Sequence, residues 1–428
     1  MRRLVLVIGI VFFVAVFGFA ATKLEVWEYG MANEFVAIIQ ELVDLEFTPA
    51  TGIEVRIVAN PYEGMQNKVL LAMVSGEPPD VLSGAADHIV EYGLRGGIVS
   101  MRKEFPGEFE KIESRLYSGV ALDHNGHGFG FVESVGAVIG YQRLDIFADL
   151  GLEYPKTWDE LYKILPRLKA NGHEVAWGYG GPASGPQWGA LTFMKQHGGG
   201  FVDPVEYRSQ LNDLGTIAGF KEYIELYTVH KMPKEINYFN MFRSGELAVF
   251  FDTVTAYAAI DMGAPELAGR WSYGLIPGTL KEDGYIDHQG FMGTGGIAIA
   301  KDSKHKEEAF KYLEWYLRDD VQIRIMTELP KRMVGAMWIT GNMAGSRAIS
   351  IREADRQILT TQLAVSTPFY YYPGAMSINR YVEFAVHDCL QMNKSPEEAL
   401  LNAHNITEQE LRNKLNEYER FIKNLLKN

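Results

Sequence analysis

The sequence predicts an α/β fold made of two lobes, and three observations lead to this class. Removing an N-terminal export signal would leave 408 of the 428 residues, more than the ~100–200 residues of one ordinary domain. Strand and helix patterns alternate from Lys23 onward, as they do in parallel sheets covered by helices. No repeat or disordered linker separates the two halves. We therefore expect ordered crossings of the chain to join the lobes.

The first twenty residues have the layout of a secretory signal peptide. Arg2 and Arg3 precede an uncharged apolar run from Leu4 to Phe19, and small residues at 18 and 20 suit a cleavage site. The run is short for a membrane span of ~20 residues, although an N-terminal membrane anchor is the alternative. No cysteine follows the run, so no lipid anchor is expected there. We expect a soluble mature protein that begins near residue 21 and is periplasmic or otherwise extracytoplasmic.

The charge and the cysteine count argue against several kinds of binding partner and of metal site. The signal segment carries two arginines and no acid, so its removal takes the formal charge from −13 to −15. An acidic surface disfavours nucleic acid and anionic lipid as partners. The single Cys389 excludes an intramolecular disulfide and any Cys-based zinc or iron–sulfur site. We expect neither a metal nor a cofactor.

The N-terminal part reads as strand, helix, strand, helix, strand. Residues 23–28, 53–58 and 80–83 have strand patterns, and the helices between them cover residues 34–47 and the stretch from Pro61 to Gly76. This order implies parallel strands with helices on both faces. Ligands of such sheets bind beyond the carboxyl ends of the strands. The residues after Trp27, Val58 and Leu82 are therefore candidates for a cleft.

The middle of the chain contains one candidate crossing strand. Residues 126–142 are apolar and glycine-rich without a helical stripe. A helix follows Thr157, which forms a capping-box pattern with Glu160, and Pro166 should bend or shorten it. Residues 178–200 are rich in glycine and proline and predict a functional loop region.

The C-terminal part returns to a strand and then becomes helical. Residues 296–300 alternate as a strand, and residues 306–317 follow as a helix. Ser395 and Pro396 predict the start of another helix. Thr407 and Glu410 predict the start of a final, separate helix.

Four segments together resemble the extracytoplasmic sugar-binding proteins of ABC importers, the family that includes maltose-binding protein. They are residues 75–81 (SGEPPDV), 151–161 (GLEYPKTWDEL), 242–249 (FRSGELAV) and 295–304 (GGIAIAKDSK). Each is a weak signal alone, but their order across some 230 residues behind a signal peptide is specific. The size of the family also matches the whole chain.

The resemblance implies a two-lobe periplasmic-binding-protein fold of the Venus-flytrap type, with about three hinge crossings. The N-terminal lobe would combine residues 21–131 and 286–331, and the C-terminal lobe residues 132–285 and 332–428. It implies a monomer that captures a sugar or oligosaccharide, delivers it to an ABC transporter permease, and is not an enzyme. The chain departs from the family at Val132, at residues 142–143 and at Thr255, where Tyr257 could substitute for a missing aromatic. The ligand therefore need not resemble maltose.

Sugar rings stack on aromatic side chains, and their hydroxyl groups pair with polar ones. Glu28 and Tyr29 follow the first strand, whereas Trp27 fits the core equally well. Tyr62 follows the second strand, where ordinary polarity at a helix start is the alternative. The resemblance places ligand contacts after the third strand. The N-terminal lobe thus offers six candidates: Glu28, Tyr29, Tyr62, Ser83, Gly84 and Asp87.

The rest of the chain offers six more candidates. Glu133 lies at the first crossing, where a buried carboxylate would need a ligand or an arginine. Trp188 stands where the family keeps a stacking aromatic. Asp252 ends a strand and serves either a ligand or a cap, and Phe291 enters the return strand. Arg332 and Trp338 lie near the last crossing.

Two other functions stay open at this point. A secreted carbohydrate-active enzyme would need two carboxyl groups whose separation no sequence spacing reveals. The same fold could instead bind an anionic solute if Arg143 and Arg332 both faced the cleft. Two weaker signals are set aside. Residues 293–298 fit G-x-G-x-x-A but open a strand rather than a helix, and the spacing of His124 and His127 fits a hairpin turn better than a metal site.

Overall fold

The computed structural model describes residues 22–61, 63–118, 122–124, 126–177, 185–333, 337–368, 370 and 372–425. The predicted signal segment lies outside this range. The described strands are β1 (Lys23–Tyr29), β2 (Glu54–Asn60), β3 (Val81–Ala85), β4 (Phe131–Arg143), β5 (Glu174–Trp177), β6 (Leu247–Thr253), β7 (Trp271–Gly274), β8 (Thr279–Leu280), β9 (Ile286–Asp287), β10 (Phe291–Ile299) and β11 (Thr367–Pro368).

Helices surround these strands. They are α1 (Asn33–Leu42), α2 (Thr48–Thr51), α3 (Met65–Ser75), α4 (Ala86–Leu94), α5 (Met101–Glu104), α6 (Glu108–Glu113), α7 (Leu144–Asp149), α8 (Trp158–Ala170), α9 (Pro186–Gln196), α10 (Leu214–Thr228), α11 (Tyr238–Ser244), α12 (Ala256–Gly263), α13 (Lys306–Tyr316), α14 (Asp319–Arg332), α15 (Met343–Arg347), α16 (Glu353–Val365), α17 (Ala375–Met392) and α18 (Pro396–Leu425). In the described range no helix has the length and apolar character of a membrane span.

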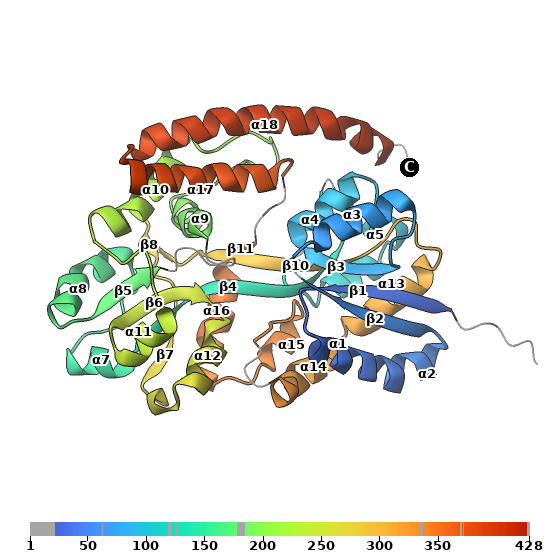
Figure 1. Cartoon of the computed structure of the whole chain (residues 1–428), viewed down its shortest axis with the longest axis horizontal. Helices are drawn as coiled ribbons and strands as arrows, with labels where there is room; N and C mark the ends of the chain where they lie inside the picture. The colour runs from blue at the N-terminus through green and yellow to red at the C-terminus, as the bar shows by residue number, and fades with distance from the viewer. Residues whose placement is uncertain are drawn as a thin grey trace, which may run out of the picture.

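Two long central strands connect the lobes (Figure 1). The sheet order is β2-β1-β3-β10-β4-β6-β5, with β1 parallel to both β2 and β3. The first part of β4, Phe131 to Ala137, pairs with β10, and its second part, Val138 to Gln142, pairs with β6. The chain therefore passes from one lobe to the other within β4. The predicted α/β two-lobe class is confirmed, while the exact lobe boundaries stay a prediction.

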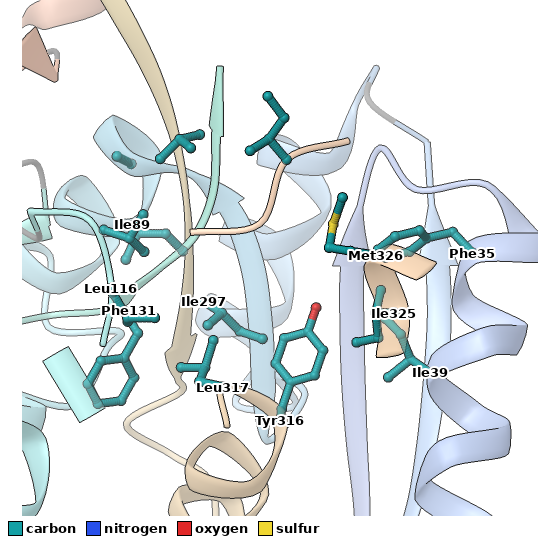
Figure 2. Close-up of a cluster of buried hydrophobic side chains, with 14 of the residues drawn as sticks. Phe35, Ile39, Ile89, Leu116, Phe131, Ile297, Tyr316, Leu317, Ile325 and Met326 are labelled. Atoms are coloured by element: carbon teal, nitrogen blue, oxygen red, sulfur yellow. The ribbon is translucent and has the colours of Figure 1, made fainter. Parts of the chain in front are cut away.

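The N-terminal lobe packs α1 and α14 against each other. Figure 2 shows Phe35 and Ile39 of α1 close to Ile325 and Met326 of α14. All four side chains are buried. Tyr316 at the end of α13 lies in the same core. Among the side chains labelled in Figure 2, only that of Tyr316 contains an oxygen atom, its hydroxyl oxygen. This core supports the strand ends that face the cleft.

The core of the C-terminal lobe holds α9 in place. Trp158 is buried, stacks on Phe193 of α9 with 4.4 Å between ring centroids, and donates from Nε1 to Oε1 of Gln196 at 2.8 Å. Thr157 caps α8 as predicted, because its Oγ1 accepts from the Glu160 backbone N–H at 3.2 Å. These contacts fix the orientation of α9, whose first turn carries Trp188.

Three predictions of local structure were wrong. Residues 178–200 are not all loop, because Pro186–Gln196 forms the helix α9, which is buried on most sides and so tolerates an unusual composition. Pro166 does not shorten α8, which continues to Ala170, so the shortening is wrong and the bend stays a prediction. Thr407 does not begin a new helix: it is fully buried inside α18, where packing overrides the local capping pattern.

The helix α18 spans both lobes along one side of the molecule (Figure 1). Its first part packs into the core of the C-terminal lobe through Leu400, Ala403 and Leu411. Near its end, Tyr418 is buried, and its hydroxyl group donates to Oε1 of Glu91 on α4 at 3.2 Å. Arg95, one turn further along α4, lies 5.5 Å from the Tyr418 ring and 3.8 Å from the Glu417 carboxylate. We call these contacts of α18 with α4 the C-terminal clasp.

Replacing Tyr418 by alanine should open the clasp without unfolding the lobes. Removing a buried aromatic ring costs about 3 kcal/mol locally, and the preceding turns of α18 remain anchored in the other lobe. Amide hydrogen exchange should therefore accelerate from residue 414 onward and in α4, but not around Leu400. Asn416→Ala, at an exposed position of the same helix, is the control. Equal exchange in both variants would contradict a clasp.

Candidate functional site

A cleft lies where the two lobes meet, and it has two adjoining chambers. The first has a volume of ≈ 540 Å³ and is lined by Ala85, Ala86, Asp87, His88, Ser134, Val135, Gly136, Val138, Trp188, Thr253, Val254, Thr255, Phe291, Gly293, Thr294, Gly295, Met337, Trp338 and Ile339. The second, of ≈ 300 Å³, is lined by Tyr29, Gly30, Met31, Ser83, Gly84, Ala85, Glu133, Ser134, Thr294, Gly295 and Trp338. Volumes of this order suit small-molecule ligands.

Parallel strands explain why residues far apart in sequence line the second chamber. Trp27 of β1 is paired with Leu82 of β3, so both strands end at the same edge of the sheet. Tyr29, Ser83 and Gly84 therefore meet there, as the strand-end argument predicts. The Tyr29 backbone N–H donates to Oγ of Ser83 at 2.8 Å and joins the two strand ends.

Two aromatic rings form one wall of the first chamber. Trp188 and Phe291 stack with 4.4 Å between ring centroids and 14° between planes. They come from α9 and β10, which are joined where the Phe291 backbone N–H donates to Oγ1 of Thr192 at 3.2 Å. This geometry offers an apolar surface wide enough for the C–H face of a ring-shaped ligand. We call the pair the aromatic wall.

Trp338 belongs to both chambers and packs against the N-terminal lobe. Its ring meets Phe35 of α1 edge to face, with centroids 4.9 Å apart. Its Nε1–H is buried and has no hydrogen-bond acceptor among the described residues. The Oγ1 atom of Thr294, which also lines both chambers, is likewise buried without a described partner. Buried polar atoms of this kind are normally paired, so both are available to a ligand or to water.

The polar lining is acidic or neutral. Asp87 and His88 begin α4, and Oδ1 of Asp87 accepts from the His88 backbone N–H at 3.0 Å. The hydroxyl groups of Thr253 and Thr255 lie 2.6 Å apart at the end of β6. No lysine or arginine is among the described residues that line the two chambers. The described lining therefore offers an anionic solute no lysine or arginine to pair with.

Two carboxyl groups are buried beside the second chamber. Glu28 is fully buried and accepts from Oγ of Ser83 at 3.0 Å, and Glu133 accepts from the Tyr316 hydroxyl group at 3.0 Å. The two carboxyl groups are also close enough to affect each other's pKa. Burial, together with the neighbouring Glu28 charge, raises the pKa of Glu133 well above its usual range. Burial also raises the pKa of Glu28.

The structure brings most of the predicted site residues to the cleft. Lining residues include Tyr29, Ser83, Gly84, Asp87, Glu133, Trp188, Phe291 and Trp338. Glu28 lies behind the lining, in contact with Ser83. Asp252 precedes the lining residue Thr253 without lining the cleft itself: its Oδ1 accepts from the Thr253 backbone N–H at 2.7 Å, and burial raises its pKa. Tyr62 lies outside the described residues.

The two predicted arginines do not meet in the cleft. Arg332 is on α14 and pairs with Glu41 of α1 at 2.6 Å. Arg143 is buried, pairs with Asp145 at 2.8 Å, and donates to the Phe242 carbonyl oxygen at 2.6 Å. Each guanidinium group thus stabilises packing within its own lobe. The condition set for an arginine clamp, that both side chains face the cleft, is not met, because both pair with structural partners.

Several lining residues were not predicted from the sequence. His88, Ser134, Thr253, Thr255 and Thr294 all line the first chamber. The threonines of β6 could have been found by applying the strand-end rule to that strand as well as to the first three. Ser134 and Thr294 had no such signal, because they lie in the middle of two long strands rather than at a strand end. These strands, β4 and β10, are neighbours only in the folded chain, where Ser134 pairs with Gly295 and Val135 with Thr294.

Comparisons with known proteins agree with this architecture. A sequence profile of the bacterial extracellular solute-binding proteins matches residues 32–323, which is more than half of the chain. The diacetylchitobiose binding protein DasA of Streptomyces coelicolor is 25% identical over 319 residues, covering 71% of each chain.

Solved structures show the same fold. The sugar-binding protein MalE of Xanthomonas citri has a TM-score of 0.78 at 18% identity, covering 93% of this chain and 99% of its own. A solute-binding protein of Thermotoga lettingae, bound to α-D-tagatose, has a TM-score of 0.70 at 18% identity, covering 91% and 100%. With this fold, the cleft between its lobes and the profile match, the chain belongs to the bacterial extracellular solute-binding proteins.

Proposed function

We propose that the protein captures an uncharged saccharide in the cleft and delivers it to the membrane permease of an ABC importer. The aromatic wall of Trp188 and Phe291 is the observation that carries this proposal, because stacked rings suit the apolar face of a sugar. Hydroxyl groups of Thr253, Thr255 and Thr294 and the indole N–H of Trp338 would pair with sugar hydroxyls. The sugar ligands named for the related proteins support the same class.

A thermal-shift panel of mono- and oligosaccharides tests the proposal. A ligand at 100 times its Kd stabilises the folded state by about 2.7 kcal/mol, which raises the melting temperature measurably. The panel should include diacetylchitobiose, because the related Streptomyces protein is named for it. An anionic arm of uronic acids and sugar phosphates should give no shift, since no described cation lines the cleft. If no saccharide shifts melting or tryptophan fluorescence, the proposal is wrong.

The cleft favours binding over glycoside hydrolysis. A glycosidase needs one ionised carboxylate and one acid on either side of the scissile bond. Here Asp87 is the only described carboxylate that lines the first chamber, and Glu133, which lines the second, lies beside Glu28 rather than across the cleft from a partner. We therefore expect no product when an oligosaccharide is incubated with substoichiometric protein. Repeated turnover would instead identify an enzyme.

A further inference from the structure

The pair of Glu28 and Glu133 has a feature that ligand binding alone does not explain. Two buried carboxyl groups lie close enough at the cleft to affect each other's pKa, yet no described cation bonds to either of them. The groups around them are the hydroxyls of Ser83, Tyr312 and Tyr316. Two negative charges in such a dry site would cost several kcal/mol. Such a pair is more stable with one carboxyl group protonated than with both ionised.

The hydrogen bonds around the pair favour Glu133 as the protonated group. Oε2 of Glu28 accepts from Ser83, but Oε1 of Glu28 is buried and accepts nothing from a described N–H or hydroxyl group. A protonated Glu133 can donate to this Oε1 while its own Oε1 accepts from Tyr316. With this hydrogen bond, the buried Oε1 of Glu28 is no longer without a donor. Placing the proton on Glu28 instead would leave an ionised Glu133 facing the chamber.

We propose that Glu28 is a positioning residue, which holds a protonated Glu133 at the second chamber and so presents an uncharged carboxyl group to the ligand. Glu28 does not line the cleft and acts through Glu133, which does. The ligand class follows from this and rests on the proposed function. The second chamber accepts hydroxyl or acetamido groups and gives no advantage to an ammonium group.

Infrared spectroscopy of the intact protein tests the proton directly, without any ligand. A protonated carboxyl group has a carbonyl stretch separate from those of carboxylates and amides. At pH 7 the wild type should show this band, and both Glu133→Gln and Glu28→Gln should lose it. In the second variant the amide of the new side chain donates to Glu133, which can then ionise. Asp252→Asn, at a half-buried strand-end carboxyl group, should retain the band of the pair.

Each other outcome overturns the proposal. A wild type without the band has two ionised carboxylates. Loss in Glu133→Gln with retention in Glu28→Gln would show that Glu133 is protonated without help from Glu28. Should a variant fail to fold by circular dichroism, carboxyl ¹³C shifts of labelled wild type across pH 5–9 answer the same question. They should show one buried glutamate that stays protonated at pH 7.

A ligand experiment tests the consequence for specificity. The affinities of an N-acetylated saccharide and its free-amine counterpart are compared at pH 7 in wild type and Glu28→Gln. Ionising Glu133 in the variant should shift the ratio of affinities about tenfold or more towards the amine, since an opposite charge nearby is worth that much. An unchanged ratio contradicts the positioning role. Binding of neither compound nor any other saccharide would refute the proposed function, and the infrared result would still stand by itself.

Discussion

Replacing Trp188 by alanine is expected to weaken saccharide binding at least about tenfold while leaving the fold intact. The ring stacks on Phe291 and lines the first chamber. Aromatic contacts contribute about 0.5–1.5 kcal/mol beyond area burial, and buried apolar area adds about 25 cal/mol per Å². Because about 1.4 kcal/mol is a factor of ten in Kd, the loss should be large. Titration calorimetry with a saccharide found in the panel measures it.

Two further variants isolate the role of the aromatic face. Trp188→Phe keeps a flat ring and should recover most of the affinity. Tyr285→Ala removes an exposed aromatic from the turn between β8 and β9, away from the lining residues, and should bind like wild type. Wild-type affinity in Trp188→Ala would mean that the aromatic wall is not the binding surface. Loss of affinity in Tyr285→Ala would place the site elsewhere.

The second large effect concerns pH and stability. Both Glu28 and Glu133 have a pKa raised in the folded state, and burial is the first cause for each. A raised pKa contributes stability that is fully present below the unfolded value of about 4.3 and is lost as the pH rises towards the folded pKa. The folded pair holds about one proton that the unfolded chain has released near pH 7. The free energy of unfolding should therefore fall by about 1.4 kcal/mol per pH unit in this interval.

Glu133→Gln should remove this slope. The amide group copies a protonated carboxyl group: it donates to Glu28 and accepts from Tyr316. The variant should therefore gain stability over wild type as the pH rises from 4.5 to 8, whereas at pH 4.5 the two should be similar. Urea unfolding at several pH values measures the difference. Glu282→Gln, at an exposed position, should follow the wild-type curve, and parallel curves for all three proteins would contradict the shared proton.

The sequence predicted the elements of the N-terminal lobe well, for a physical reason. The strand at residues 23–28 and the helix at 306–317 were found within a residue or so, because hydrophobic periodicity directly reports which face of an element is buried. The helix α9 was missed because it is buried on several faces and shows no stripe. Thr407 was misread because a capping pattern is local, whereas burial of that side chain inside α18 depends on distant packing.

The site residues also fall into those that the sequence could predict and those that depend on the folded chain. Tyr29, Ser83 and Gly84 followed from parallel strands that end at one edge, which is a rule of topology and can be read from the order of elements. The positions of Arg143 and Arg332 could not be read in this way. An arginine has a long side chain with several donors, and only the folded chain showed that the Phe242 carbonyl oxygen lies within reach of Arg143 and Glu41 within reach of Arg332.

The sequence by itself determined the α/β two-lobe class, the family resemblance and most of the strand ends that face the cleft. These depend on periodicity, order and motifs, all of which are local along the chain. Only the tertiary structure decided that Trp188 stacks on Phe291, that the arginines are engaged elsewhere, and that Glu28 meets Glu133. Trp188 and Phe291, Arg332 and Glu41, and Glu28 and Glu133 are each separated by some hundred residues or more in sequence, so only the folded chain brings them together.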